Sequence, residues 1–219
     1  MRCLFVWTSI LAVTLIAPAA AVAQATQPAS AAAVAVDTTT PKGALKSLAV
    51  AMDAGNAPAI RSLLLTTNAS EEKMVGAMAD VAANIAAMNK AITTRFGQEQ
   101  AKQALGGDPA EMLKQSMLTI DAATEKVDGD TAIVSTPSQE SMTLKKVGSG
   151  WKISVADLSR GSTPAAVDER VAALSAQMKA MQEVTAGVAA GKYATANDAV
   201  AAIRTRLGGP AQPPPATKP

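Results

Sequence analysis

Apolar residues recur at helical spacing soon after residue 40. One such segment follows Thr40 and Pro41, a capping residue and a proline suited to the first helical turn, and it ends at Gly55-Asn56. A shorter segment follows it. The apolar positions are Leu45, Leu48, Ala49 and Met52 in the first segment, and Ile60, Leu63 and Leu64 in the second. This spacing predicts two short helices.

A third segment is much longer than the first two. It begins near Asn68 or Ser70, and Gly97 is predicted to end or kink it after Phe96. Its apolar residues alternate at steps of four and three and form one continuous seam: Met74, Met78, Val81, Ile85, Met88 and Ile92. A further helical piece is predicted to close at Gly106-Gly107.

Asp108 and Pro109 provide an acidic cap and a first-turn proline, which predict another short helix reaching about Met117. The apolar period then changes to two. Strands are predicted over 118–127 and 131–135, joined by a hairpin at Asp128-Gly129. A third strand carries Met142 and Leu144. It turns at Gly148-Ser149-Gly150 into a fourth strand, in which Trp151, Ile153 and Val155 share a face that we expect to be buried against the helices.

Helical spacing returns behind Thr163-Pro164 and continues to around Gly191, and a last helix is capped by Thr195. The apolar positions are Val167, Val171, Leu174, Met178, Met181 and Val188 in the long helix, and Val200, Ile203 and Leu207 in the last one. The predicted fold class is therefore α+β, with N-terminal helices packed on a four-stranded antiparallel meander and followed by a C-terminal helical extension.

The ends of the chain differ in composition from the part between them. Met1-Arg2, an apolar run and Ala21-Val22-Ala23 are typical of a signal peptide, cleaved before Gln24. An uncleaved membrane anchor is the alternative, and Cys3 is misplaced for lipidation. The predicted organisation is a signal peptide over 1–23, a disordered leader over 24–39, an α+β domain over 40–160, a helical extension over 161–208 and a disordered proline-rich tail over 209–219.

Composition narrows the possible functions. The chain has no histidine, and its one cysteine lies in the predicted signal peptide, so the usual residues of transition-metal sites and of most active sites are missing. Charges are interspersed, and the longest basic run is Lys145-Lys146. Because nucleic acid binding requires a concentrated basic surface, we expect no nucleic acid partner. No segment after the signal peptide is apolar for long enough to span a bilayer, so no stable membrane insertion is expected after cleavage.

Two sets of segments resemble the nuclear transport factor 2-like superfamily. Residues 40–48, 54–56 and 60–64 resemble its opening helical pair, and residues 127–130, 144–146 and 150–153 resemble the closing strands of its secreted members. The resemblance implies a cone-shaped α+β domain whose sheet wraps a pocket, used for catalysis, apolar ligand binding or protein association. The long third helix departs from the common pattern. Because histidine is absent and Tyr193 lies beyond the strands, no catalytic set transfers to this chain.

Carboxylates and methionines are the remaining groups with possible chemistry. A carboxylate pair could hydrolyse glycosides, and the candidates are Glu111, Asp121, Glu125, Asp128 and Asp130. We interpret Asp128 and Asp130 as hairpin residues, and Asp121 and Glu125 as a solvated strand face. Met74 with Met78, and Met178 with Met181, could bind Cu(I), but the same positions complete the apolar seams, which favours core packing.

The sequence thus predicts a secreted or periplasmic, non-catalytic binding or interaction module, whose partner is an unidentified protein or a small apolar ligand. No catalytic residue, metal site or cofactor is assigned, and the ligand-binding residues are unknown. One alternative is a hydrolase or isomerase of the cone fold that works without histidine. Another is a structural helical envelope protein whose two long seams pack on each other or on a second copy.

Overall fold

The computed structural model describes residues 36–138, 140–156 and 163–207. Its helices are α1 (Pro41–Asp53), α2 (Ala57–Leu63), α3 (Ala69–Phe96), α4 (Gln98–Leu105), α5 (Pro109–Ala122), α7 (Pro164–Ala189) and α8 (Ala196–Arg206). The strands are β1 (Leu64–Leu65), β2 (Thr124–Asp128), β3 (Thr131–Ser135), β4 (Ser141–Val147) and β5 (Gly150–Ser154). The α+β class is confirmed. The predicted signal peptide, residues 24–35 of the predicted leader and the whole predicted proline-rich tail lie outside the described residues.

The helix starts follow from capping chemistry. The side chains of Thr40, Asp108, Thr163 and Thr195 each accept a hydrogen bond from a backbone N–H of the helix that follows, as predicted. Asn68 caps α3 in the same way. Each cap satisfies one of the N–H groups that a helix start leaves without a partner.

The sheet differs from the prediction by one strand. Strands β2 to β5 form the predicted antiparallel meander, but the sheet has five strands in the order β1-β5-β4-β3-β2. The additional strand, β1, pairs in parallel with β5, with Leu64 opposite Ile153. Leu64, predicted on a helical face, therefore belongs to the sheet. A two-residue strand is too short to show an alternating pattern, and the spacing of Leu64 after Ile60 favours the helix before it.

The boundary between α5 and β2 was also predicted incorrectly. The helix continues to Ala122, so residues 118–121 are helical and the strand begins only at Thr124. Leu113, Met117 and Ile120 keep the helical spacing, and Ile120 is buried. Asp121 is therefore on the last turn of α5 rather than on a strand face, and its carboxylate lies 2.5 Å from Nζ of Lys46.

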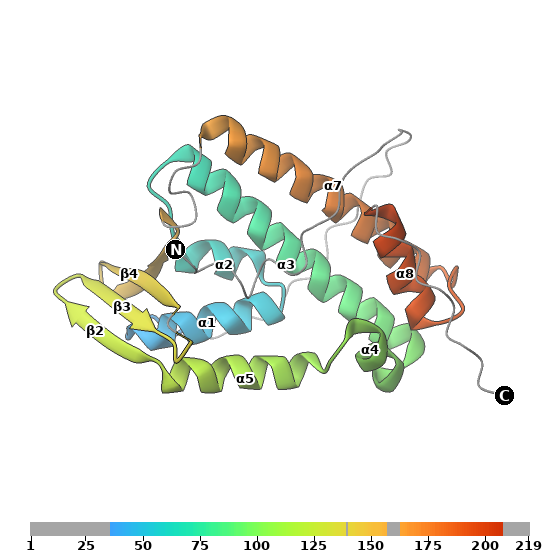
Figure 1. The fold of residues 1–219 in the computed structure, drawn as a ribbon, viewed down its shortest axis with the longest axis horizontal. Coiled ribbons are helices and arrows are strands. Elements are labelled where there is room, and N and C mark those ends of the chain that lie inside the picture. Colours follow the sequence, from blue (N-terminus) through green and yellow to red (C-terminus); the bar gives the residue numbers. More distant parts are fainter. Residues whose placement is uncertain (1–35, 139, 157–162, 208–219) are drawn as a thin grey trace.

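The first hydrophobic core lies between the sheet and helices α1, α2 and α3, and the last turn of α5 reaches it (Figure 1). Trp151, Ile153 and Val155 are buried in it, which confirms the predicted face. The other large buried members are Leu45, Ile60, Leu63, Leu64, Val75, Ile120, Val134 and Leu144.

Residues just before α1 are attached to this core. The backbone N–H of Trp151 donates to the carbonyl of Thr38 at 2.8 Å, and the N–H of Asp37 donates to Oγ of Ser47 at 2.8 Å. The end of the predicted leader, residues 36–39, therefore runs along β5 and α1.

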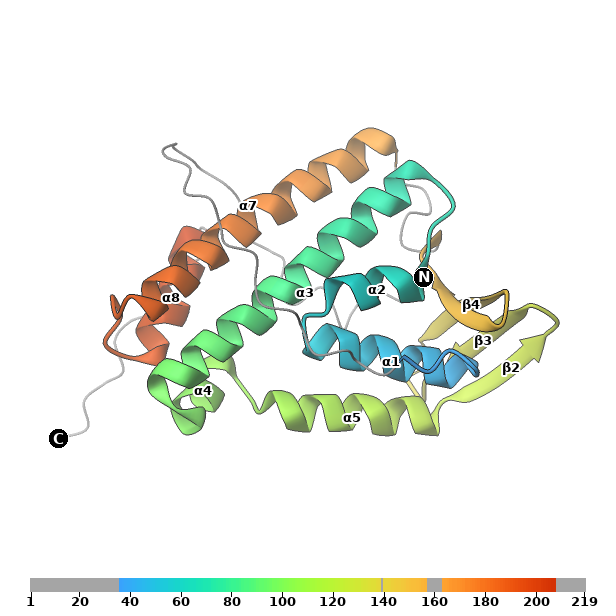
Figure 2. The ribbon, with the colours of Figure 1, turned by 180° about the vertical axis from the view of Figure 1, so that it is seen from behind.

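The second core is entirely helical and lies at the opposite end of the molecule from the sheet (Figures 1 and 2). It is formed by the C-terminal halves of α3 and α7 together with α4 and α8. Its buried members are Met88, Ile92, Ala101, Ala104, Val184, Val188, Ala196, Ala199 and Ile203. The predicted extension, 161–208, thus supplies α7 and α8 to a core that α3 and α4 complete.

Helices α3 and α7 lie side by side in both views and run in the same direction (Figures 1 and 2). Near their starts, Lys73 and Asp168 form an ion pair of 2.7 Å. Near their ends, Gly191 lies against Arg95, so closely that a Cβ at 191 would come within 3.1 Å of the guanidinium. The predicted α3 seam is buried at Met74, Met88 and Ile92 and half-buried at its other positions. Among the described residues, no helix combines the length and the apolar character needed to cross a membrane.

Candidate functional site

The inner face of the sheet is closed by packed apolar side chains. Ala132, Val134 and Leu144 have no exposed area, and Ile60 and Leu63 opposite them on α2 have none either. The buried polar residues of the described chain, which are Ser47, Asn56, Glu71 and Thr136, take part in hydrogen bonds of caps, turns and loops. The space under the sheet is therefore occupied by the first core.

A cleft of about 540 Å³ opens elsewhere, beside the turn that joins α4 to α5. From this turn α5 runs back along α1 (Figure 1). Its lining residues come from α1, α3, α4, α5 and the turn between α4 and α5. The lining residues are Asp53, Thr93, Gln98, Ala101, Lys102, Leu105, Asp108, Pro109, Ala110, Leu113, Lys114 and Met117. This volume lies within the range of roughly 300–1,000 Å³ that is usual for small-molecule sites.

The cleft exists because α5 is only partly covered. Ile120 is the buried residue of α5, while Leu113 and Met117 are half-buried and face the cleft. On the opposite wall, Ala101 belongs to the second core and Leu105 packs against it. The cleft therefore lies at the junction of the two cores, and most of its wall is apolar.

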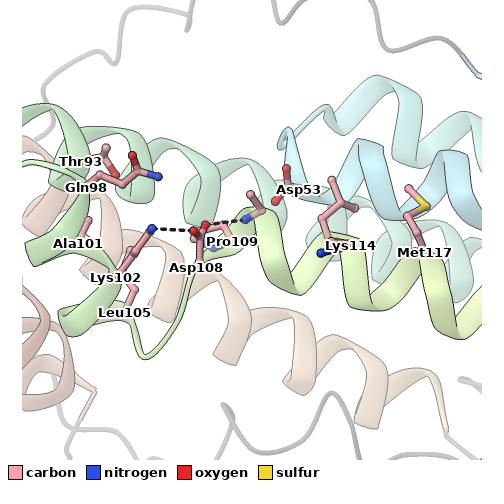
Figure 3. Close-up of a pocket in the computed structure, with 12 residues that line it drawn as sticks. Asp53, Thr93, Gln98, Ala101, Lys102, Leu105, Asp108, Pro109, Lys114 and Met117 are labelled. Carbon is pink, nitrogen blue, oxygen red and sulfur yellow. Dashed lines mark hydrogen bonds and ion pairs between the residues drawn. The ribbon is translucent and has the colours of Figure 1, made fainter.

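An ion pair lies within the lining of the cleft (Figure 3). Nζ of Lys102 lies 2.9 Å from the Asp108 carboxylate and 3.7 Å from that of Glu99. The hydrogen bond and charge of Asp108 raise the pKa of Lys102. The hydrogen bond from Lys102, together with that from the backbone N–H of Ala110, lowers the pKa of Asp108. Asp108 thus caps α5 and fixes α4 to it at the same time.

Asp53, the last residue of α1, lies between Pro109 and Lys114 in Figure 3. Within the described residues, its carboxylate forms no hydrogen bond or ion pair, whereas Lys114 pairs with Glu111 at 3.5 Å. Asp53 is exposed as a residue, but desolvation of its carboxyl group on the protein side raises its pKa by disfavouring the charged form.

The carboxylates considered from the sequence do not form one site. Glu111 and Asp121 lie at opposite ends of α5, while Glu125, Asp128 and Asp130 are exposed along the β2–β3 hairpin. Gly129 in that hairpin has φ of 56°, the left-handed backbone that its turn was predicted to need. Across residues 36–138, 140–156 and 163–207, no three acidic, histidine or cysteine side chains are grouped so that they could hold a metal ion.

The methionine pairs lie on the two parallel helices. Met74 is buried, Met78 is half-buried, and both belong to α3. Met178 and Met181 are half-buried on α7, where Met181 packs against the second core. These positions agree with the interpretation of the methionines as packing residues.

Comparisons with protein-family models, with curated proteins and with solved structures gave no match. The resemblance to the nuclear transport factor 2-like superfamily stays a prediction. The cleft must therefore be interpreted from its own residues.

Sequence reasoning missed the cleft and its main residues. Lys102 and Asp53 carry no motif, and Asp108 was recognised only as a cap. Lys102 and Asp108 meet because Gly106, with φ of 80°, reverses the chain between α4 and α5. The one signal present was the combination of two glycines, a capping aspartate and a proline after a short helix, which marks a tight helix–helix turn.

Proposed function

We propose that this protein is an exported, non-catalytic binding module that holds a small apolar ligand in the cleft beneath α5. The observation that carries the proposal is the contrast between two places where apolar side chains meet. Under the sheet they pack together and are buried, whereas along α5 they line an open cleft. An open apolar cleft with a few polar groups at its rim is the usual form of a ligand site.

The polar groups of the cleft support binding rather than catalysis. Lys102 and Asp108 neutralise each other in an ion pair that also joins two helices, so neither is poised as an acid or base near neutral pH. Asp53 is a single carboxylate without a second catalytic group beside it in the lining, since Lys114 is paired with Glu111. The hydrolase or isomerase alternative has less support from this geometry.

The structural alternative has its own supporting observation. The long seams of α3 and α7 pack on each other within one chain, as that alternative expects. A scaffold and a binding module are not exclusive, because the parallel pair leaves the cleft open on the other side of α3. They differ in whether the cleft binds anything.

The test uses N-phenyl-1-naphthylamine, an uncharged apolar dye whose emission rises in apolar sites. We expect saturable binding that is lost in Leu113→Glu, because this substitution places a charge on the cleft wall. Leu118→Glu is the matched control, since Leu118 is on the same helix, is 52% exposed and does not line the cleft. Equal binding by the two folded variants, or no saturable binding by the natural chain, would contradict the proposal.

A further inference from the structure

The charges around the cleft do not balance. The residues that line the cleft, together with their ion-pair partners, include two lysines and four acidic residues. These are Lys102, Lys114, Asp53, Glu99, Asp108 and Glu111. Both lysines are engaged by carboxylates of their own or the neighbouring helix. The carboxylate left over is that of Asp53.

The position of Asp53 strengthens the negative potential at this end of the cleft. Asp53 is the last residue of α1, and the last turn of that helix carries no basic residue. The C-terminal end of a helix dipole is negative, so an acidic residue there is unfavourable and a cation beside it is favourable. Two independent features, an unpaired carboxylate and a helix C-terminus, thus favour a positive charge at the same place.

The remainder of the cleft wall favours an apolar body. Leu105, Pro109, Leu113 and Met117 line the same cleft as the Lys102–Asp108 ion pair and Asp53. A ligand with an apolar chain could lie against these side chains while its charged end reaches Asp53. An anionic ligand would instead face the carboxylates that already surround both lysines.

We propose that the cleft binds a cationic amphiphile, an alkyl or aryl body ending in an ammonium group, with the Asp53 carboxylate as its counter-ion. This inference rests on the proposed function and adds the charge of the ligand to it. Asp53 is an exposed residue, so its carboxylate is accessible to a cation held in the cleft, and such a cation would offset the desolvation that raises the pKa of Asp53.

The experiment compares three ligands of equal chain length below their micellar concentrations: dodecylammonium, 1-dodecanol and dodecanoate. Binding is measured by isothermal titration calorimetry on the full chain at pH 7 and low salt. We expect dodecylammonium to bind roughly tenfold more tightly than dodecanol, as for a hydrogen bond to a charged group, and dodecanoate to bind most weakly. Raising the salt concentration should reduce the preference.

Asp53→Asn should bring the affinities for dodecylammonium and dodecanol together while leaving dodecanol binding unchanged. Asp130→Asn is the matched control, because it removes an exposed carboxylate in the β2–β3 hairpin and should keep the preference. A preference that survives Asp53→Asn, or equal affinity for all three ligands, would overturn the inference.

The outcomes separate the two proposals. If dodecanol binds and Leu113→Glu abolishes its binding, but no preference for the cation is found, the cleft is an apolar site and only the inference about charge fails. If none of the three ligands binds the natural chain, the proposed function fails and the inference fails with it.

Discussion

The two hydrophobic cores of this protein differ in the elements that they join, a sheet and helices in the first and helices alone in the second. The first places large residues such as Trp151, Leu144 and Ile60 between a sheet and helices. Four of the nine buried residues of the second core are alanines, which bring α4 and α8 close together. Helix α3 runs through both without a break. Helix α3 therefore couples the two cores, although each core is packed by its own set of side chains.

The difference between the cores explains the position of the cleft. A sheet face offers a wide surface that several helices cover at once, and the first core is closed by apolar contacts on its inner side. Helices alone meet over narrower stripes, and the second core reaches the cleft at Ala101 and Leu105. Helix α5 bridges from one core to the other and is fully covered by neither, which leaves its apolar face open.

The largest expected effect comes from removing a buried side chain in each core. Leu144→Ala and Ile92→Ala both truncate side chains with no exposed area, and each should cost about 2–5 kcal/mol of unfolding free energy. Because α3 joins the cores, we expect one cooperative transition in both variants. Urea unfolding should be followed by circular dichroism and by Trp151 emission in a chain that begins at Gln24, where Trp151 is the sole tryptophan.

A native emission maximum to the blue of the unfolded chain is expected in these measurements, since Trp151 is 5% exposed. Separate transitions would show that the cores fold independently. In particular, a shift of the dichroism curve by Ile92→Ala without a shift of the Trp151 curve would contradict the coupling through α3.

A smaller loss of stability is expected on substituting glycines with positive φ by alanine, and its size should differ between Gly55 and Gly106. Gly55 has φ of 62° and lies against α3, where an added Cβ would come within 2.6 Å of the Ala86 Cβ and 3.0 Å of the Ala83 Cα. Gly55→Ala should cost about 2–4 kcal/mol, the sum of left-handed strain and overpacking. The measurement is thermal or urea unfolding of the purified variant.

Gly106→Ala is the control for this substitution. Gly106 has φ of 80°, but an added Cβ would meet nothing within 4 Å, so only the backbone strain of about 1 kcal/mol applies. The turn after α1 is thus packed on the first core and the turn after α4 is open. Equal losses at the two glycines would show that the close approach of Gly55 to α3 is absent.

The smallest effect concerns the ion pair that joins α4 to α5. Asp108→Asn keeps a capping side chain but removes the charge, so its melting temperature should fall slightly below that of the natural chain. The Asp108 pKa is lowered, so its contribution is present above the ordinary pKa of 3.8 and is lost as pH falls through the folded value. The Lys102 pKa is raised, so its contribution is present below 10.5 and is lost as pH rises through the folded value.

Melting temperatures of the two proteins should therefore differ over a plateau between about pH 5 and pH 10 and converge outside it. Added salt should shrink the difference, because both side chains are partly exposed. A difference that persists at pH 2 would mean that Asp108 acts through something other than its charge.

The residues themselves determined most of the secondary structure, because caps, glycines and apolar periods are local signals. Thr40, Asp108, Thr163 and Thr195 mark helix starts, and Asp128-Gly129 marks the hairpin. Local signals failed where two periods overlap. Leu113, Met117 and Ile120 continue a helix through a stretch that also alternates, and burial of Ile120 decided for the helix.

Only the tertiary structure decided the parallel pairing of β1 with β5 and of α3 with α7, the division into two cores and the position of the cleft. In each case the partners are far apart in the sequence, as Leu64 is from Ile153 and Lys73 from Asp168. Asp53 shows the reason most clearly. Its residue type and neighbours are those of an ordinary helix end, and it acquires a candidate role only because α5 returns along α1 and leaves its carboxylate unpaired beside an apolar wall.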